Sequence, residues 1–316
     1  MIPRGRPRNL HASFLSTFGA RFLLFLPIKT FARTDNCEVI GGHISTQPQP
    51  PDLAEIKKRQ QRAWASGDYA MFGAALLIIS ELLCEAVDLR PSEKVLDVAT
   101  GSGNTALAAA RRFCEVTGID YVPTLLERGR ERAAAERLEV AFQDGDAEDI
   151  PFPDASFDVV LSTVGVMFAP DQRKAAGELI RVCRPGGRIG LASWTPDSFA
   201  AEMPRVFARY VPPPPGLESP ALWGKEEHVR KLLGDGTRDL HATRRTFVFR
   251  YRSVGHYLQM LQTYLGPTRE SFRLLDAESK ESLTDDLAGL VNRFNRSGDG
   301  TMVVPSDYLE VVAIKG

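Results

Sequence analysis

The clearest pattern of apolar and polar positions lies in residues 95–105, VLDVATGSGNT, where an apolar run around Asp97 gives way to small and glycine residues. The apolar part is typical of a parallel strand that is buried on both faces. Gly101 and Gly103 allow a tight turn and the close approach of a ligand. Apolar residues then return at helical spacing up to Phe113, which predicts a helix over 104–113. A strand, a glycine turn and a helix N-terminus together predict a nucleotide-type pocket.

Three further strands follow the same rhythm. Residues 116–119 form an apolar run that ends in Asp120, which is placed to accept hydrogen bonds from a ribose diol. The segment 145–160, GDAEDIPFPDASFDVV, puts Asp146 and Ala147 at a strand end and then predicts a strand over 157–162. The segment 181–194, RVCRPGGRIGLASW, reads as a helix end, a Pro-Gly-Gly turn and another strand.

Helical patterns separate these strands. Helices are predicted from residue 52 to a break at Gly67, over the apolar stretch 71–89 and over 122–140. The stretch 71–89 carries Glu81 and Glu85 after about ten apolar residues, which favours a buried core helix over a membrane span. Strands that alternate with helices in this way predict parallel β-α-β crossovers, with the ligand site outside the carboxyl ends of the strands.

The pattern changes after Trp194. Residues 195–243 contain the proline run VPPPPG and a short helix predicted over 225–233, and are interpreted as a covering insertion. A strand is then predicted over 244–252, a helical pair over 254–294, and a final strand at DYLEVVAIK. We therefore divide the chain into 1–51, the core 52–194, the insertion 195–243 and the last two strands with their helical pair, 244–316.

Composition narrows the class of protein only slightly. The 316 residues are 43% hydrophobic and 25% charged with a formal net charge of -1, which argues against a dominant nucleic-acid surface. The four cysteines are widely spaced and show no metal-binding pattern, so we expect no bound metal. Cysteines of this kind also indicate a reducing, cytoplasmic location. Residues 1–51 are rich in arginine, with no acid before Asp35, and are interpreted as a disordered leader or a spurious N-terminal extension.

The glycine turn alone allows two interpretations, because Gly101, Gly103 and Ala106 also match the dinucleotide spacing G-x-G-x-x-A. The ordered set of the turn, Asp120, the GDAEDIPF element and the Pro-Gly-Gly turn resembles the class I S-adenosylmethionine (SAM)-dependent methyltransferases. Within them the chain is similar to the ubiquinone/menaquinone C-methyltransferase group, whose members also carry alanine at the position of Ala99. The resemblance covers about residues 56–194 well and the remainder loosely.

This resemblance implies an α/β fold, a doubly wound Rossmann-like seven-stranded sheet that is mostly parallel with its last strand antiparallel, and helical covering insertions. It implies SAM as the cofactor. Asp97 and the backbone of Gly101 and Gly103 would face the methionine part, Asp120 the ribose, and Asp146 with Ala147 the adenine edge. The full set of expected cofactor-binding residues is Tyr69, Asp97, Ala99, Gly101, Gly103, Asp120, Tyr121, Asp146, Ala147 and Thr163.

Other positions keep two interpretations each. The resemblance makes Trp64, Asp68 and Tyr69 candidate lid residues, but Trp64 is equally a core anchor and Asp68 an N-cap. Val164 is a further cofactor contact, while Phe168 can belong to the core. No catalytic base is assigned, because the histidines and tyrosines at His228, His256, Tyr257 and Tyr264 are more often structural.

The expected reaction is methyl transfer to a small, partly apolar organic acceptor by in-line displacement. The D-P-P-Y or N-P-P-Y motif of DNA-methylating members is absent after the strand 157–162, so nucleic acid is not the expected partner. Stable membrane insertion is not expected either. The protein is expected to be a monomer or a homodimer. The insertions are expected to line the acceptor pocket with Phe199, Met203, Phe207, Tyr210, Trp223, Tyr257, Met260, Leu261 and Tyr264. The alternatives are a catalytically silent SAM-binding regulator and an NAD(P)-dependent oxidoreductase.

Overall fold

A computed structural model describes residues 52–316, and the predictions made for 1–51 lie outside these residues. Its centre is a seven-stranded sheet in the order β3-β2-β1-β4-β5-β7-β6. The strands are β1 (Lys94–Val98), β2 (Glu115–Asp120), β3 (Ala141–Asp144), β4 (Phe157–Thr163), β5 (Cys183–Trp194), β6 (Thr237–Tyr251) and β7 (Met302–Lys315). The first five pair in parallel, and β7 runs antiparallel between β5 and β6, as expected.

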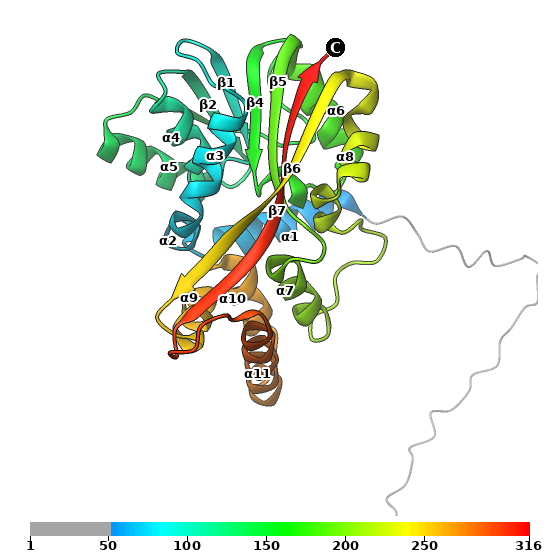
Figure 1. Cartoon of the computed structure of the whole chain (residues 1–316). Helices are drawn as coiled ribbons and strands as arrows, with labels where there is room; N and C mark the ends of the chain where they lie inside the picture. Colours follow the sequence, from blue (N-terminus) through cyan, green and yellow to red (C-terminus); the bar gives the residue numbers. More distant parts are fainter. Residues whose placement is uncertain (1–51) are drawn as a thin grey trace, which may run out of the picture. The chain divides into compact units, whose positions relative to one another are not determined.

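Helices cover both faces of this sheet, with α3, α4 and α5 on one side and α6 and α8 on the other (Figure 1). The α-helices are α1 (Leu53–Ala65), α2 (Tyr69–Gly73), α3 (Leu77–Ala86), α4 (Asn104–Ala110), α5 (Pro123–Glu136), α6 (Gln172–Val182), α7 (Phe199–Ala208), α8 (Glu226–Leu233), α9 (Val254–Tyr264), α10 (Gly266–Arg273) and α11 (Ala277–Phe294). Short 3-10 turns lie at η1 (Ala74–Leu76), η2 (Val166–Phe168), η3 (Pro220–Gly224) and η4 (Gly234–Gly236). The doubly wound architecture expected from the alternating pattern is therefore confirmed.

The core helices bury the faces that their sequences present. Leu125, Leu126, Gly129 and Ala133 of α5 are the buried residues of that helix, as their spacing predicts. The apolar segment Tyr69–Ala86 is long and apolar enough by composition to cross a membrane, but it is divided into α2, η1 and α3. Its inner side, including the fully buried Ile79 and Leu83, packs in the hydrophobic core, while Met71 and Ile78 are exposed.

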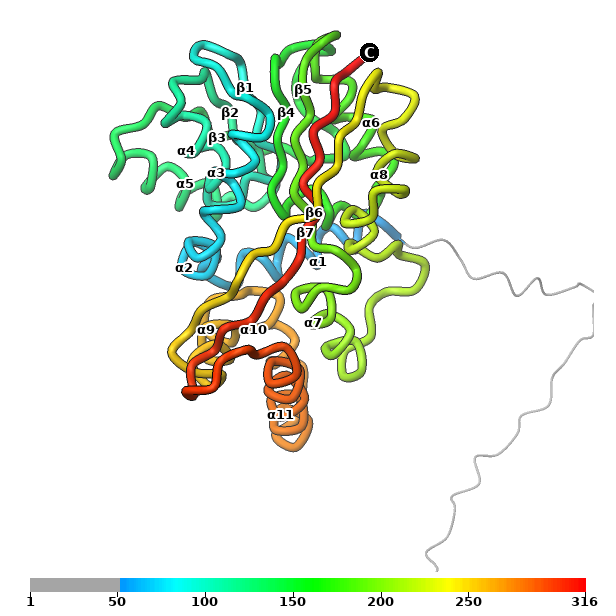
Figure 2. The backbone as a smooth tube through the Cα atoms, in the orientation of Figure 1, coloured from blue at the N-terminus to red at the C-terminus, as the bar shows by residue number. Residues whose placement is uncertain are grey.

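The strands β6 and β7 run beside each other for their whole length and continue past the other strands toward α9, α10 and α11 (Figure 2). The strand predicted over 244–252 therefore begins earlier, at Thr237, because the pairing with β7 starts there. The expected helical pair consists of three helices. The backbone is extended at Leu265, which ends α9 before Gly266 and Pro267 begin α10.

Two local predictions in the core are also corrected. The helix after the glycine turn ends at Ala110, and Phe113 lies outside it, 79% exposed and with φ +62°. Its carbonyl accepts a hydrogen bond from the Ser92 amide, so the chain turns there to enter β2. The Pro-Gly-Gly segment is a bulge within β5, where the pairing passes from Phe157–Cys183 to Val159–Arg188.

Candidate active site

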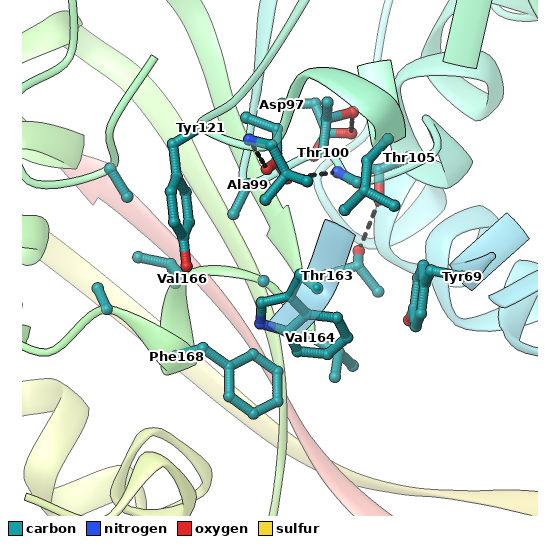
Figure 3. Close-up of a pocket in the computed structure, with 18 of the residues that line it drawn as sticks. Tyr69, Asp97, Ala99, Thr100, Thr105, Tyr121, Thr163, Val164, Val166 and Phe168 are labelled. Carbon is teal, nitrogen blue, oxygen red and sulfur yellow. Dashed lines mark hydrogen bonds between the residues drawn. The ribbon is translucent and has the colours of Figure 1, made fainter. Parts of the chain in front are cut away.

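A cavity lies at the carboxyl ends of β1, β2 and β4, and Figure 3 shows the side chains that point into it. All of the described residues that line it lie between Lys57 and Pro170. They are Lys57, Gln60, Trp64, Tyr69, Leu76, Ser80, Asp97, Ala99, Thr100, Gly101, Asn104, Thr105, Asp120, Tyr121, Val122, Leu125, Gly145, Asp146, Ala147, Thr163, Val164, Gly165, Val166, Phe168, Ala169 and Pro170. The position is the one that parallel α/β sheets offer to ligands.

Asp97, at the end of β1, holds the glycine turn in shape. Its Oδ2 accepts hydrogen bonds from the Thr100 hydroxyl at 2.5 Å and from the Ala106 amide at 2.9 Å. Burial raises the pKa of this carboxyl to about 7, although both hydrogen bonds favour the ionised form. Asp97 therefore acts first on the loop and on the start of α4, and only through them on a ligand.

Asp120, at the end of β2, braces the same turn from the other side. Its two oxygens accept hydrogen bonds from the amides of Gly101 and Val122, both at 2.9 Å. Burial raises the pKa of Asp120 to about 6, and the backbone hydrogen bonds oppose that rise. The Tyr121 amide also acts on this carboxyl. A carboxylate offers about four acceptor positions, so at least one remains for a ligand hydroxyl.

Two of the seven described non-glycine residues with positive φ lie where β1 and β4 end at the cavity. Ala99 has φ +54° and Val164 has φ +52°, a conformation that is especially unfavourable for a β-branched residue. The two turns meet at Gly165, where a Cβ atom would lie 2.6 Å from the Ala99 carbonyl oxygen. Strain of this kind is retained where the surrounding structure fixes it, and functional sites are common places for it.

Helix α1 lies across the carboxyl ends of the strands and is held there by polar contacts (Figure 1). Lys57 Nζ lies 2.6 Å from carboxylate oxygens of both Asp146 and the buried Glu148. Burial lowers the pKa of Lys57, but the two carboxylates raise it by more, so the side chain remains charged. Gln60 donates to the Phe168 carbonyl at 3.2 Å, and Gln61 to the Tyr121 carbonyl at 2.5 Å.

One side of the cavity is aromatic. The ring of Trp64 lies 5.7 Å from that of Tyr69 and 5.5 Å from that of Phe168, both in edge-to-face arrangements. All three rings line the cavity, so they serve as its wall rather than as buried core. Burial raises the pKa of Tyr69 to about 12, which keeps its hydroxyl neutral.

Nine of the ten residues predicted to bind the cofactor line the cavity. They are Tyr69, Asp97, Ala99, Gly101, Asp120, Tyr121, Asp146, Ala147 and Thr163. Gly103 does not, because it packs behind the turn, where a Cβ atom would lie 2.8 Å from the ring of Phe142. Its contribution is a φ of +85° at the start of α4.

Several cavity residues were not found from the sequence. Lys57 and Gln60 were missed because the pattern of a helix does not show which residues its polar face contacts.

Asp68, a candidate lid residue or N-cap, lies outside the cavity lining and makes no capping hydrogen bond. It lies 3.8 Å from Arg128 instead.

The residues expected to line an acceptor pocket after Trp194 are elsewhere. None of the nine apolar residues predicted for this role belongs to the described cavity lining. Phe199, Trp223 and Tyr257 are no more than 1% exposed and pack with other aromatic and aliphatic residues. The possible bases His228, His256, Tyr257 and Tyr264 are also absent from the described lining. The expectation that the segments after Trp194 line the pocket is therefore corrected.

Comparisons with known proteins agree with the fold and indicate the class of protein. Residues 96–191 match the family described as "Methyltransferase domain". The chain is 41% identical over 212 residues to an uncharacterised protein of Mycobacterium tuberculosis, covering 66% of this chain and 77% of that protein. It is 38% identical over 124 residues to a demethylmenaquinone methyltransferase of Deinococcus radiodurans, covering 38% of this chain and 52% of that protein. The fold is similar to the crystal structure of the YcgJ protein from Bacillus subtilis, with a TM-score of 0.54, 21% identity, and 75% and 98% of the two chains covered.

Proposed function

Because the chain belongs to the class I SAM-dependent methyltransferases of the quinone C-methyltransferase-like group, we propose that it methylates a small, partly apolar organic acceptor. The observation that carries this proposal is the aromatic wall of Trp64, Tyr69 and Phe168 on one side of the cavity. A wall of this kind suits a planar or aliphatic molecule better than a highly charged polymer.

The cavity residues fit the cofactor of this enzyme class. Asp120 keeps acceptor capacity for a ribose hydroxyl, and the turn at Gly101 has no side chain that would block a close approach. Within residues 52–316 the buried Oε1 of Gln60 has no hydrogen-bond partner, which suits an N–H donor on the ligand. We assign Asp120 and the turn to the ribose and methionine parts, and Asp146 with Ala147 to the adenine side.

SAM supplies a methyl group that is already activated by its sulfonium charge, so the protein's work is mainly orientation and exclusion of water. Asp97 and Asp120 fix the turn from two directions, and α1 covers the cavity through Lys57 and Gln60. Holding two reactants in the correct geometry can lower a barrier by about 7–11 kcal/mol.

The cavity offers little help with proton removal. Tyr69 is neutral, Lys57 is paired with two carboxylates, and Oδ2 of Asp97 and both oxygens of Asp120 already accept hydrogen bonds. An acceptor that loses its proton to solvent suits these surroundings. The oxyanion of a quinol or phenol, which is nucleophilic at its oxygen and at its ring carbons, is of this kind. The similarity to demethylmenaquinone methyltransferases supports testing quinols first.

The test has two stages. Calorimetric titration with SAM, its demethylated product S-adenosylhomocysteine and NAD(H) should give micromolar binding of the first two and no binding of the third. A tritiated-methyl screen over quinols, phenols and amines then identifies the acceptor class. Trp64→Ala should lower transfer to that class at least tenfold, while Phe113→Ala, which removes an exposed ring outside the cavity, should change it little. Binding of SAM with no transfer to any class would favour the silent regulator, and binding of NAD(H) alone would favour the oxidoreductase.

A further inference from the structure

Three hydroxyl groups from three different elements form a chain that ends in the cavity. Ser80 of α3 lies 3.0 Å from Thr105 of α4, and the Thr105 hydroxyl donates to Thr163 of β4 at 2.9 Å (Figure 3). Ser80 and Thr105 are almost completely buried, whereas Thr163 is only half-buried. All three line the cavity.

The direction of this chain follows from counting hydrogens. A hydroxyl group has one hydrogen to donate. Because Thr105 gives its hydrogen to Thr163, it can only accept from Ser80. The Thr163 oxygen accepts from Thr105, and within residues 52–316 its own hydrogen is donated to no protein group. The hydrogen of Thr163 is therefore available to whatever occupies the cavity.

The surrounding backbone fixes where this donor points. Val164, the next residue, is held at φ +52° while its amide donates to the Ala192 carbonyl at 2.8 Å. A strained residue that is pinned to the neighbouring strand leaves the side chain of Thr163 little freedom to turn away. Hydrogen bonds in a row also polarise one another, which strengthens the last donor.

The position of Thr163 places it away from the ribose side. Asp120 is the last residue of β2 and Thr163 the last residue of β4, with β1 between these two strands in the sheet. Figure 3 shows Tyr121 and Thr163 on opposite sides of the cavity, with Thr163 between the Asp97 turn and the aromatic residues. The aromatic wall is where the proposed function places the methyl acceptor.

We propose that Thr163, which the resemblance assigned to the cofactor, is instead a specificity-determining residue that donates a hydrogen bond to an oxygen atom of the methyl acceptor. Ser80 and Thr105 are positioning residues that orient it. This inference rests on the proposed function, since it assumes an apolar acceptor at the aromatic wall. It selects acceptors that carry a hydroxyl or oxyanion over hydrocarbons of the same shape.

The experiment uses the full chain saturated with S-adenosylhomocysteine and two probes, 1-naphthol and naphthalene, which differ by one hydroxyl group. The wild type should bind 1-naphthol roughly fivefold to tenfold more tightly, the ratio expected for one neutral hydrogen bond. Thr163→Val should abolish the preference and Thr163→Ser should retain it, both with unchanged affinity for S-adenosylhomocysteine. Thr105→Val should reduce the preference through loss of orientation alone. Thr284→Val, which removes a threonine hydroxyl on α11 outside the cavity lining, is the matched control.

Equal binding of the two probes by the wild type, or a preference that survives Thr163→Val, would overturn the inference and leave the proposed function intact. Lost affinity for S-adenosylhomocysteine in Thr163→Val with the naphthol preference unchanged would place the accepting oxygen on the cofactor and also overturn it. Failure of both probes to bind would overturn the proposed apolar acceptor itself, and the inference with it.

Discussion

The parts of the chain before and after Trp194 use aromatic residues in opposite ways. In residues 52–194, Trp64, Tyr69 and Phe168 line a cavity, and the buried carboxylates of Asp97 and Asp120 lie at strand ends. After Trp194, aromatic residues pack on one another: the ring of Phe199 lies 5.7–5.9 Å from those of Phe249, Tyr257 and Phe294. Aromatic content alone therefore does not locate a ligand site.

The parts before and after Trp194 also differ in backbone strain. Every described non-glycine residue with positive φ lies between Asp88 and Val164, and none lies in 195–316. The second part instead supports the first from outside. The approach of α10 to α1 is so close that a Cβ atom on Gly266 would lie 2.0 Å from the Ala63 carbonyl oxygen, and Arg269 donates to the Ser66 carbonyl. We infer that the C-terminal helices act on the cavity by holding α1 in place.

The largest effect on stability should come from removing a buried aromatic ring from the part of the chain after Trp194. Phe199→Ala should destabilise the protein by about 3–5 kcal/mol, because a completely buried ring is replaced by a void. Urea unfolding measures this loss, and titration below the unfolding range should show unchanged affinity for SAM. Phe168→Ala is the matched change at the cavity, with little loss of stability but weaker binding. The contrast between the two regions would be wrong if Phe199→Ala weakened SAM binding more than Phe168→Ala did.

A smaller effect should follow from releasing α1. Lys57→Met leaves the buried Glu148 without its cation and should cost about 1–3 kcal/mol, less than a fully buried pair because Lys57 retains some contact with solvent. SAM affinity should fall severalfold as α1 loosens over the cavity. Lys58→Met, at an exposed position on the same helix, is the control and should change neither quantity. An equal loss in both variants would show that the charge pair does not hold the helix.

The pH dependence of SAM affinity should report on Asp120. Its pKa is raised to about 6 in the free protein, so Asp120 takes up a proton below that pH. Ligand hydroxyls bind the ionised form, and SAM affinity should therefore fall below pH 6, by up to about tenfold per pH unit for one proton. Calorimetry between pH 5 and 8 measures the slope, and Asp120→Asn should weaken binding and flatten the profile. A slope that persists in Asp120→Asn would assign the proton to another group, with Asp97 the next candidate.

The stability of the free protein should respond to pH with the opposite sign. In both Asp97 and Asp120 the folded-state pKa lies above the ordinary value of 3.8. Between about pH 4 and pH 7 the folded state then binds more protons at these groups than the unfolded state does. Their contribution to stability is therefore present at low pH and is lost as pH rises through the folded-state values.

The sequence alone predicted the elements whose local pattern of apolar and polar residues is clear. The strands β1, β2 and β4, the helix α5 and the sites of Asp97 and Asp120 follow from periodicity and from where strands end. Antiparallel β7 followed from resemblance to a family, since nothing local tells a strand which neighbours it will have.

What could not be predicted depends on contacts between residues far apart in the chain. Lys57 pairs with Asp146, which lies 89 residues later in the chain, and the pattern of a helix does not identify that partner. Trp64 and Phe199 are both aromatic residues on or beside apolar helix faces, yet only Trp64 reaches the cavity, because α1 crosses the strand ends and α7 does not. Nor does composition reveal that Gly103 supports Phe142 while Gly101 borders the cavity.

The smallest effect should come from relieving backbone strain outside the cavity. Phe113→Gly replaces an exposed ring at φ +62° with the residue that tolerates this conformation, and should stabilise the protein by up to about 1 kcal/mol. SAM affinity should stay the same, because Phe113 lies outside the cavity lining. Val164→Gly relieves similar strain next to Thr163, but it also frees the backbone that directs that hydroxyl, so it should lower the preference for 1-naphthol. Thermal unfolding and the two-probe titration compare the variants directly, and an unchanged preference in Val164→Gly would show that the strain at Val164 has no part in positioning Thr163.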